Sequence, residues 1–281
     1  MSATPTSVRG APDPSLKQQV RDFWDRESCG ETYAVGEDAR AKLHAHQRTR
    51  YELEPYICDF AQFLDGKGKD VLEIGVGMGA DHLEWAKSKP RSLTGIDLTP
   101  RAVEFTKQRF QLFGYESRLE VGDAENLPFP DNSFDLIYSW GVLHHSPDTP
   151  RAIEQVQRVL RPGGTARIMI YHYFSVVGYM LWVRYGPMSG KPFRSLADIY
   201  ANHLESPGTK AYTVKQTREM CRKFTHSNIR VAQSFGDLLQ GAVGQRHRGL
   251  ILTTTKALWP RWFIKRFMKN HGAMVLIDAV K

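Results

Sequence analysis

The sequence predicts an α/β fold in which a parallel sheet is covered by helices on both faces. Short apolar runs alternate with helix-like segments through the middle of the 281-residue chain, and this alternation is typical of such a sheet. A turn with three glycines follows the first apolar run, between Asp70 and Gly79. Glycine lets the backbone approach a ligand closely, and the helix that follows offers free N–H groups. We therefore expect a ligand to bind at this turn.

The segment ahead of the glycine turn is expected to be helical, because apolar residues recur there at helical spacing. The first helix would place Val20, Phe23 and Trp24 on one side. The predicted helices cover 16–26, 36–50 and 51–64.

Strands and helices then alternate. The predicted strands are 70–74, 92–96, 119–121, 134–139 and 165–171. The predicted helices are 81–87, 100–113 and 149–159. The second of these helices has a clear start, because Thr99 can cap it and Pro100 suits the first helical position. Arg161-Pro-Gly-Gly164 provides a matching stop for the last helix.

The alternation is interrupted after His172. Large apolar and aromatic residues fill 173–185, and 186–211 looks like a long loop. A loop of that length in a compact protein is usually functional or mobile. Beyond it we expect a helix over 213–224, a strand over 228–234, an apolar and basic insertion over 237–270, and a closing strand over 273–280.

The cysteine content and the N-terminal composition indicate a soluble, cytoplasmic protein. The three cysteines are Cys29, Cys58 and Cys221, which are far apart and lack metal-ligand spacing, so reduced thiols and no metal are expected. The first fifteen residues contain no signal-like apolar core. No stretch is long enough to suggest a transmembrane segment.

Basic residues are concentrated near the C-terminal end. The whole chain has a formal net charge of +8, and residues 241–281 contain eight basic residues against one acidic residue. A localised basic segment can attract nucleic acid, an anionic membrane surface or an acidic substrate. A solvated helix face explains the same charges equally well. Peripheral membrane contact through Trp259, Trp262, Phe263 and Phe267 is a further hypothesis.

Acidic residues at successive strand ends favour one ligand class for the glycine turn. Glu73 precedes the first glycine, Asp97 ends the second strand and Asp123 follows the third. Together with the segments 135–145 and 159–164, these three acidic residues form a pattern that resembles the class I S-adenosylmethionine-dependent methyltransferases of the type 11 branch. The resemblance covers about 67–172. It implies a Rossmann-like fold with a mostly parallel seven-stranded sheet, an N-terminal helical lid and C-terminal insertions.

This resemblance also implies a cofactor, S-adenosyl-L-methionine, and roles for particular residues. The glycine backbone would admit the methionine portion, Asp97 would bind the ribose, and Asp123 the adenine amino group. Helix capping by Asp97 and turn formation by Asp123 are the structural alternatives. The expected cofactor contacts are Glu73, Gly75, Gly77, Gly79, Asp97, Leu98, Asp123, Ala124, Ser139 and Trp140.

Catalytic candidates follow the fourth and fifth strands. Methyl transfer depends mainly on placement of the acceptor, and a general base helps where the acceptor is a hydroxyl or a protonated amine. Histidine is the best base candidate near neutral pH. We expect His172, Tyr171 and His145 to fill these roles, with hydrogen bonding that orients the loop as the alternative.

The implied organisation is one large domain. Residues 1–15 are expected to lack fixed structure, 16–66 to form the lid, 67–172 the cofactor-binding core, and 173–281 the acceptor-side insertion with the closing strands. The resemblance suggests a small-molecule acceptor, such as a biosynthetic or secondary-metabolite intermediate, without identifying it.

Three other functions stay open. Gly75-x-Gly77-x-x-Ala80 also fits a loose dinucleotide fingerprint, so an NAD(P)-dependent oxidoreductase is one alternative. A module that binds the donor without catalysis is another. An RNA-modifying methyltransferase could use the basic C-terminal region. Ser139-Trp-Gly-Val142 replaces the Asn/Asp-Pro-Pro-Tyr/Phe signature of many nucleic-acid and protein amino-methylating enzymes, which argues against the RNA alternative.

Overall fold

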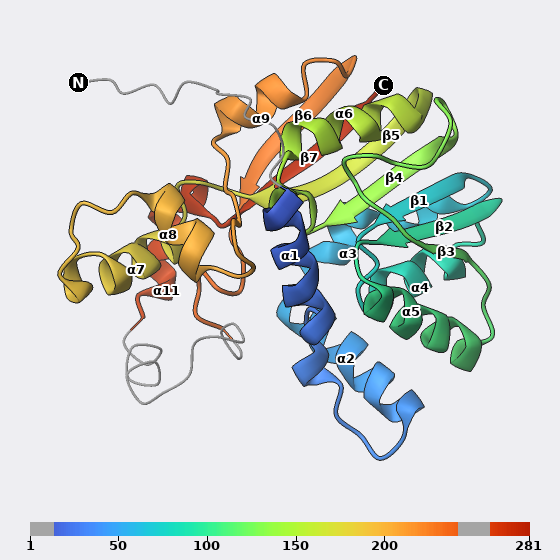
Figure 1. The fold of residues 1–281 in the computed structure, drawn as a ribbon, viewed down its shortest axis with the longest axis horizontal. Coiled ribbons are helices and arrows are strands. Elements are labelled where there is room, and N and C mark those ends of the chain that lie inside the picture. Colours follow the sequence, from blue (N-terminus) through green and yellow to red (C-terminus); the bar gives the residue numbers. More distant parts are fainter. Residues whose placement is uncertain (1–13, 241–258) are drawn as a thin grey trace.

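The computed structural model describes residues 14–240 and 259–281 and contains a seven-stranded sheet (Figure 1). The strand order is β3-β2-β1-β4-β5-β7-β6, in which β7 runs antiparallel to both neighbours and the remaining pairs are parallel. This sheet confirms the predicted fold class. The strands are β1 Asp70–Ile74, β2 Ser92–Asp97, β3 Arg118–Val121, β4 Phe134–Trp140, β5 Leu160–Tyr171, β6 His226–Ala232 and β7 Met274–Val280.

Apolar side chains cover both faces of the sheet because successive residues of a strand point to opposite sides. Leu72 of β1 packs in one buried cluster, with Ile153 of α6 and Phe224. Its neighbour Val71 packs in the opposite cluster, with Leu83 of α4 and Phe110 of α5. The helices that flank the sheet are α4 Ala80–Lys87, α5 Pro100–Phe113, α6 Thr149–Val159 and α9 Val214–Met220.

The bounds of α5 and α6 match the predicted helices, since their ends are encoded locally. Thr99 Oγ1 accepts a hydrogen bond from Ala102 N–H, and Pro100 occupies the first turn of α5. Gly114 ends that helix in a left-handed conformation. Helix α6 stops at Val159 as expected, but the Arg161-Pro-Gly-Gly164 stretch belongs to β5 rather than to a free loop.

The predicted division of the N-terminal helices was wrong in detail. The helices are α1 Pro14–Arg26, α2 Ala39–Leu53 and α3 Tyr56–Ala61. Helix α2 begins after Asp38, whose carboxylate caps Ala41 N–H. A proline disfavours helical backbone in the residue before it, so Glu54, before Pro55, leaves the helical region. The predicted unstructured segment 1–15 lies almost entirely outside the described residues, and its last two residues begin α1.

The segment 186–211, expected to be a loop, contains a helix. Helix α8 Leu196–His203 follows α7 Val176–Tyr185, and Ser195 caps its start. The side chain of Tyr200 is buried and hydrogen-bonds with Ser175 Oγ and the Tyr173 carbonyl. The helix therefore depends on contacts with residues far along the chain, which its own periodicity does not reveal.

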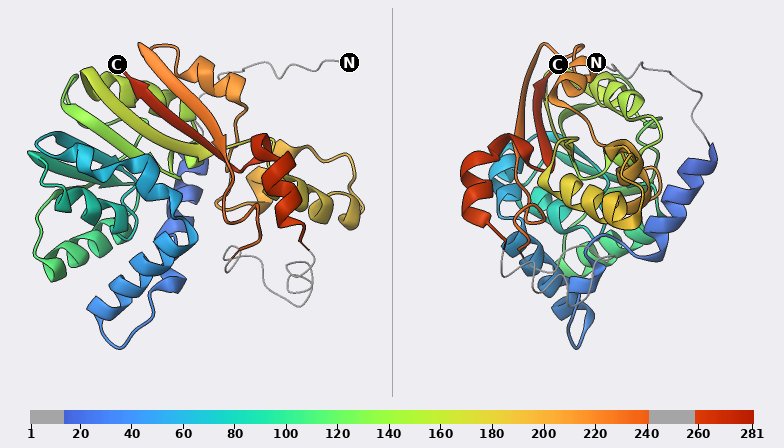
Figure 2. Two further views of the ribbon diagram at one scale, coloured as in Figure 1. Left: turned by 180° about the vertical axis from the view of Figure 1, so that it is seen from behind. Right: turned by 90° about the vertical axis from the view of Figure 1, so that its left-hand side faces the viewer.

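Helix α1 and three helices from the C-terminal half of the chain lie at the same edge of the sheet. The arrowheads of the central parallel strands point toward α1, with α7, α8 and α11 Arg261–Phe267 beyond it (Figure 1). Figure 2 shows the same arrangement from behind and from the side. Among the described residues, no helix is long and apolar enough to cross a bilayer.

Candidate functional site

A cavity of about 670 Å³ lies at the carboxyl edge of the sheet. Ligand sites in open α/β sheets lie at this edge, and pockets of about 300–1,000 Å³ hold small molecules. The sequence-predicted residues that line it are Glu73, Gly75, Gly77, Asp97, Leu98, Asp123, Ala124, Trp140, His145, Tyr171 and His172.

Two expected cofactor contacts, Gly79 and Ser139, do not line this cavity. Gly79 has a φ of +72° and packs against Thr106, so it ends the turn and begins α4. Ser139 is fully buried, and its hydroxyl donates to the Ile74 carbonyl at 3.0 Å. Both residues therefore support the cavity wall without lining the cavity.

The first two glycines of the turn have different structural tasks. Gly75 has a φ of +85°, and an added Cβ would come within 2.8 Å of Val142 Cγ1. Gly77 also has a positive φ, of +51°, but an added Cβ would meet no atom within 4 Å. Gly75 is therefore required for close packing against the loop after β4, while Gly77 exposes backbone to the cavity.

Asp97 connects this turn to the start of α5. Its Oδ2 accepts from Gly77 N–H at 3.1 Å, and its Oδ1 accepts from the N–H and hydroxyl of Thr99, both at 3.0 Å. A carboxylate has about four acceptor positions. The backbone N–H of Leu98 also stabilises this carboxylate. Burial raises the pKa of Asp97, while these hydrogen bonds oppose the rise.

Lys17 of α1 reaches the other predicted nucleoside contact. Its Nζ lies 2.6 Å from Asp123 Oδ2 and 2.6 Å from Glu125 Oε2. These ion pairs attach α1 to the loop after β3. Sequence reasoning missed Lys17, because no local pattern distinguishes it from other basic residues of an exposed helix.

Glu73 is held in a buried network beneath the turn. Its Oε2 lies 2.9 Å from His82 Nδ1, and His82 Nε2 lies 2.7 Å from Ser117 Oγ, which donates to the Leu93 carbonyl. Burial raises the pKa of Glu73 well above its usual range and lowers the pKa of His82 to about 3. A protonated Glu73 and a neutral His82 with its hydrogen on Nε2 are compatible with all of these hydrogen bonds.

A second buried network, around Asp81, was not anticipated. Asp81 of α4 accepts from Arg50 at 3.0 and 2.7 Å, from the Tyr51 hydroxyl at 3.0 Å and from the Tyr138 hydroxyl at 2.9 Å. Burial alone would raise the pKa of Asp81, but the Arg50 guanidinium and the hydroxyl donors lower it. Arg50 and Asp81 both line the cavity. The charge pattern of α4 does not indicate that Asp81 pairs with Arg50, which lies 31 residues earlier.

Acid is expected to destabilise the protein, in part through His46 of α2. Burial and the adjacent Arg109 and Arg50 lower the pKa of His46 to about 3, whereas an unfolded histidine titrates near about 6.5. Between these values the unfolded chain binds a proton that the folded chain does not. As the pH is lowered through this range, His46 should therefore reduce the free energy of unfolding by up to about 1.4 kcal/mol per pH unit.

The test is urea unfolding of His46→Gln over this window. The variant should lose less stability than the wild type between about pH 6 and pH 4. His226→Gln, at an exposed position that begins β6, should keep the wild-type pH dependence. Equal pH slopes for the His46 variant and the wild type would contradict the assignment.

Two of the three catalytic candidates, Tyr171 and His145, meet near the end of β5, where Glu205 joins them. The Tyr171 hydroxyl donates to Glu205 Oε2 at 2.8 Å, and His145 Nε2 lies 3.2 Å from the same oxygen. His172 instead donates from Nδ1 to the Gly272 carbonyl at 3.0 Å. Glu205 falls in the segment expected to be a loop, and no signal in the sequence identified it.

Asp237 anchors the far wall of the cavity. It is fully buried and accepts hydrogen bonds from the backbone N–H groups of Val177, Ser234 and Ala273. Burial raises its pKa, and these donors oppose the rise. Its carboxylate thereby connects α7 to the segments that follow β6 and precede β7.

Helix α11 presents aromatic and basic side chains on the surface. The side chain of Trp262 is 74% exposed, and Phe263 and Phe267 are also exposed, beside Lys265 and Arg266. Peripheral membrane contact remains a prediction, in part because residues 241–258 lie outside the described residues. Co-sedimentation with anionic vesicles at low salt tests it, and absence of binding there would remove it.

Comparison with known sequences matches part of the chain to one family. The family model described as a methyltransferase domain matches residues 72–168. A phthiotriol/phenolphthiotriol dimycocerosates methyltransferase from Mycobacterium leprae is 39% identical over 133 residues, 47% of this chain and 44% of that protein. A fatty-acid O-methyltransferase from Mycolicibacterium smegmatis is 38% identical over 116 residues, 41% of each chain. The 27-O-demethylrifamycin SV methyltransferase of Amycolatopsis mediterranei is 38% identical over 99 residues, 34% of this chain and 36% of that protein.

The matched region thus spans less than half the length of these relatives. Solved structures share the fold over a longer range. A Haemonchus contortus phosphoethanolamine N-methyltransferase 2 covers 93% of this chain, and 60% of its own length, with a TM-score of 0.60 and 17% identity. The (4+2)-cyclase SpnF covers 94% of this chain, and 96% of its own length, with a TM-score of 0.56 and 18% identity. At this identity both comparisons establish the fold only.

Proposed function

Residues 72–168 form a methyltransferase domain of the type 11 family, and from that premise we propose that this chain transfers a methyl group from S-adenosylmethionine to a small apolar molecule. One observation carries the proposal. A single cavity joins the glycine turn and strand-end carboxylates to a wall of aromatic and aliphatic side chains. The cavity therefore offers a polar place for the donor beside an apolar place for the acceptor.

The polar end has the donors and acceptors that the cofactor requires. We propose that the backbone at Gly77 approaches the methionine portion, since nothing lies within 4 Å of its missing side chain. Asp97, which lines this end of the cavity, would accept from a ribose hydroxyl. Asp123 would accept from the adenine amino group, sharing its carboxylate with Lys17. Arg50, which bonds Asp81 and Glu54, also lines the cavity and would add positive charge near the methionine carboxylate.

The other end of the cavity suits a hydrophobic acceptor. Its wall is formed by side chains of α7 and α8 and of the segments beside β6 and β7. These side chains are Val177, Met180, Leu181, Tyr200, Leu204, Phe235, Leu239 and Met274. The relatives named above act on fatty acids, dimycocerosate lipids and a rifamycin. A lipid or polyketide-like acceptor fits both observations.

The catalytic side chains would act by positioning the acceptor and by receiving a proton. When bound, S-adenosylmethionine supplies an electrophilic methyl group for in-line attack by an acceptor atom. Burial and Glu205 raise the pKa of Tyr171 well above its usual range, so its hydroxyl stays protonated and can donate a hydrogen bond. Glu205, which faces His145 and Tyr171, is the better placed proton acceptor. His172 would hold the acceptor loop through its bond to Gly272.

The experiment is a transfer assay with methyl-labelled S-adenosylmethionine. Purified protein is incubated with fatty acids, phenolic lipids and aromatic polyketides, and the label is measured after organic extraction. We expect label in at least one apolar product with the wild type, and much less with Asp97→Asn at the same donor concentration. Label confined to an RNA fraction would favour the RNA-modifying alternative instead.

Two further alternatives give different results in the same preparation. An NAD(P)-dependent oxidoreductase should be stabilised against heating by NAD(P) rather than by S-adenosylhomocysteine. A module that binds the donor without catalysis should show affinity for it but no transfer, even to cell extract. Because a similar fold belongs to a cyclase, donor binding alone does not establish methyl transfer.

A further inference from the structure

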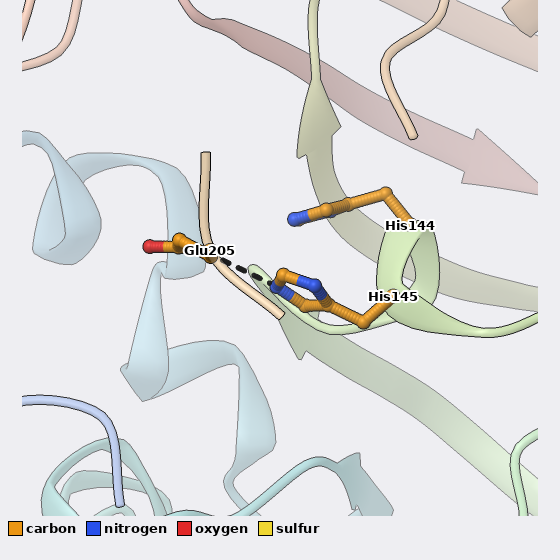
Figure 3. A group of neighbouring side chains, drawn as sticks. All are labelled: His144, His145 and Glu205. Atoms are coloured by element: carbon orange, nitrogen blue, oxygen red, sulfur yellow. Dashed lines mark ion pairs between the residues drawn. The ribbon is translucent and has the colours of Figure 1, made fainter. Parts of the chain in front are cut away.

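We propose that His144, His145 and Glu205 form a binding site for one divalent transition-metal ion in the wall of the cavity. Each residue offers one ligand atom, and these atoms lie within 4.8 Å of one another. Figure 3 shows both histidine rings extending from one short turn toward Glu205. The sequence carried no metal-binding spacing, because Glu205 is sixty residues from His145 and joins it only through the fold.

The state of His144 is the first observation that supports an ion. Its ring is fully buried, and neither Nδ1 nor Nε2 has a hydrogen-bond partner among residues 14–240 and 259–281. Leaving a buried polar group unpaired costs about 1–3 kcal/mol, so such groups usually have an ion or water as partner. A neutral imidazole has one nitrogen lone pair available for a metal.

The surroundings of His145 are the second, independent observation. The Thr209 hydroxyl donates to the Ser206 carbonyl at 2.7 Å, which leaves Thr209 Oγ1 to accept from His145 Nδ1 at 3.1 Å. Ser206 Oγ lies 2.9 Å from the same nitrogen. A metal-bound histidine characteristically donates its other ring N–H to such a partner. The tautomer with its hydrogen on Nδ1 directs the lone pair of Nε2 toward Glu205.

The distance between His145 and Glu205 fits a shared ion. His145 Nε2 is buried and has no aligned hydrogen bond, although Glu205 Oε2 lies 3.2 Å away. Two ligand atoms at about 2.0–2.2 Å from one ion are separated by about 3–3.6 Å. The His144 ligand atom would need to move inward by about 1 Å to complete the same geometry.

The ligand set favours particular metals. Two imidazoles and one carboxylate suit zinc, iron(II), cobalt(II) or nickel(II), whereas magnesium and calcium prefer oxygen ligands alone. Three protein ligands leave at least one coordination position open. His145 and Glu205 line the cavity, so that position faces the acceptor end.

A metal here would have a defined task, and this part of the inference rests on the proposed function. An acceptor hydroxyl or carboxylate bound at the open position would be held in place. Coordination would also lower the pKa of a hydroxyl, so that it attacks more readily. Tyr171, which donates to Glu205 Oε2, would orient the carboxylate.

The test measures metal binding directly and without methyl donor. Full-length protein is treated with a chelator, dialysed against zinc or cobalt(II), and analysed for bound metal by mass spectrometry. We expect one ion per chain that is lost in His144→Ala and Glu205→Gln, with affinity reduced about tenfold or more. His226→Ala, which removes an exposed histidine outside the cluster, should bind like the wild type. Cobalt(II) bound to the wild type should show visible absorption typical of nitrogen and oxygen ligands.

Circular dichroism establishes that the variants are folded before binding is compared. Wild-type protein that binds no zinc or cobalt(II) more tightly than the folded His144→Ala variant would overturn the proposal. Metal binding without methyl transfer would leave the metal site intact and count against the proposed function. Methyl transfer that is equally fast with and without the chelator, in protein that binds the ion, would remove only the catalytic task.

Discussion

Replacement of Asp97 by asparagine is expected to weaken binding of S-adenosylhomocysteine about 10- to 100-fold, because hydrogen bonds to a charged group contribute about 1.5–3 kcal/mol. Two effects combine in this variant. The amide has less negative charge with which to accept from a ribose hydroxyl. It also weakens the bonds to Gly77 N–H and to Thr99, which hold the glycine turn in its cavity-lining position.

Isothermal titration calorimetry with S-adenosylhomocysteine measures this effect. Asp131→Asn is the matched control, because Asp131 is exposed and pairs only with Arg158 in the described structure. The control should bind like the wild type. If Asp97→Asn retains wild-type affinity while its circular dichroism spectrum is unchanged, Asp97 is a helix cap and not a cofactor ligand.

Gly75→Ala is expected to lower the free energy of unfolding by about 2–5 kcal/mol. The left-handed conformation of this position costs an alanine about 1–2 kcal/mol, and the overlap of its Cβ with Val142 adds about 1–3 kcal/mol. Val142 lies in the loop that follows β4, so relief of the overlap would displace a wall of the cavity. Urea unfolding monitored by circular dichroism measures the loss.

The neighbouring glycine provides an internal control. Gly77→Ala meets the conformational penalty but no overlap, so its stability loss should be the smaller of the two. Its new methyl group would project into the cavity, and its cofactor affinity should therefore fall although the fold is kept. A Gly75→Ala/Val142→Ala double variant should recover part of the lost stability. Equal losses for the two single variants would refute this account of the turn.

Both of these predictions concern the polar end of the cavity. Asp97 and Gly75 have no direct contact with the apolar acceptor wall, so their variants should change cofactor binding or stability without changing acceptor preference. Residues at the other end, such as Met180 and Leu204, should have the converse effect. The separation follows from the cavity itself, whose two ends are built from different parts of the chain.

The strand and helix order was predictable because the signals for it are local. The apolar run from Val71 to Ile74 is buried on both faces, as its composition indicated. Thr99 and Pro100 specify the start of α5 within three residues of one another. The two elements predicted wrongly, the single helix over 51–64 and the loop over 186–211, failed for identifiable reasons. The first was broken by Pro55, and the second became helical because Tyr200 is buried against distant residues.

The candidate site was predictable only where it follows directly from a strand. Asp97 ends β2 and Asp123 lies two residues after β3, and these strands lie side by side. Their place at one edge of the sheet therefore follows from parallel pairing. Lys17 and Glu205 could not be identified in this way. Their partners are 106 and 34 residues away, and no periodicity or motif connects positions at such separations.

By itself, then, the chain's order of residues determined which segments between residues 70 and 171 become strands and helices, that the sheet is mainly parallel, and that glycines and carboxylates gather at its carboxyl edge. The hydrophobic periodicity, the helix caps and the backbone preferences each depend on a few residues that are close together in the sequence. The folded structure alone decided that α1 is tied to Asp123 by Lys17, that Tyr171 and His145 share Glu205, and that His144 is buried without a partner. These features arise because the fold brings side chains that are distant in the sequence together in the protein interior. The dielectric constant is low there, so a nitrogen or oxygen atom without a hydrogen-bond partner destabilises the folded state.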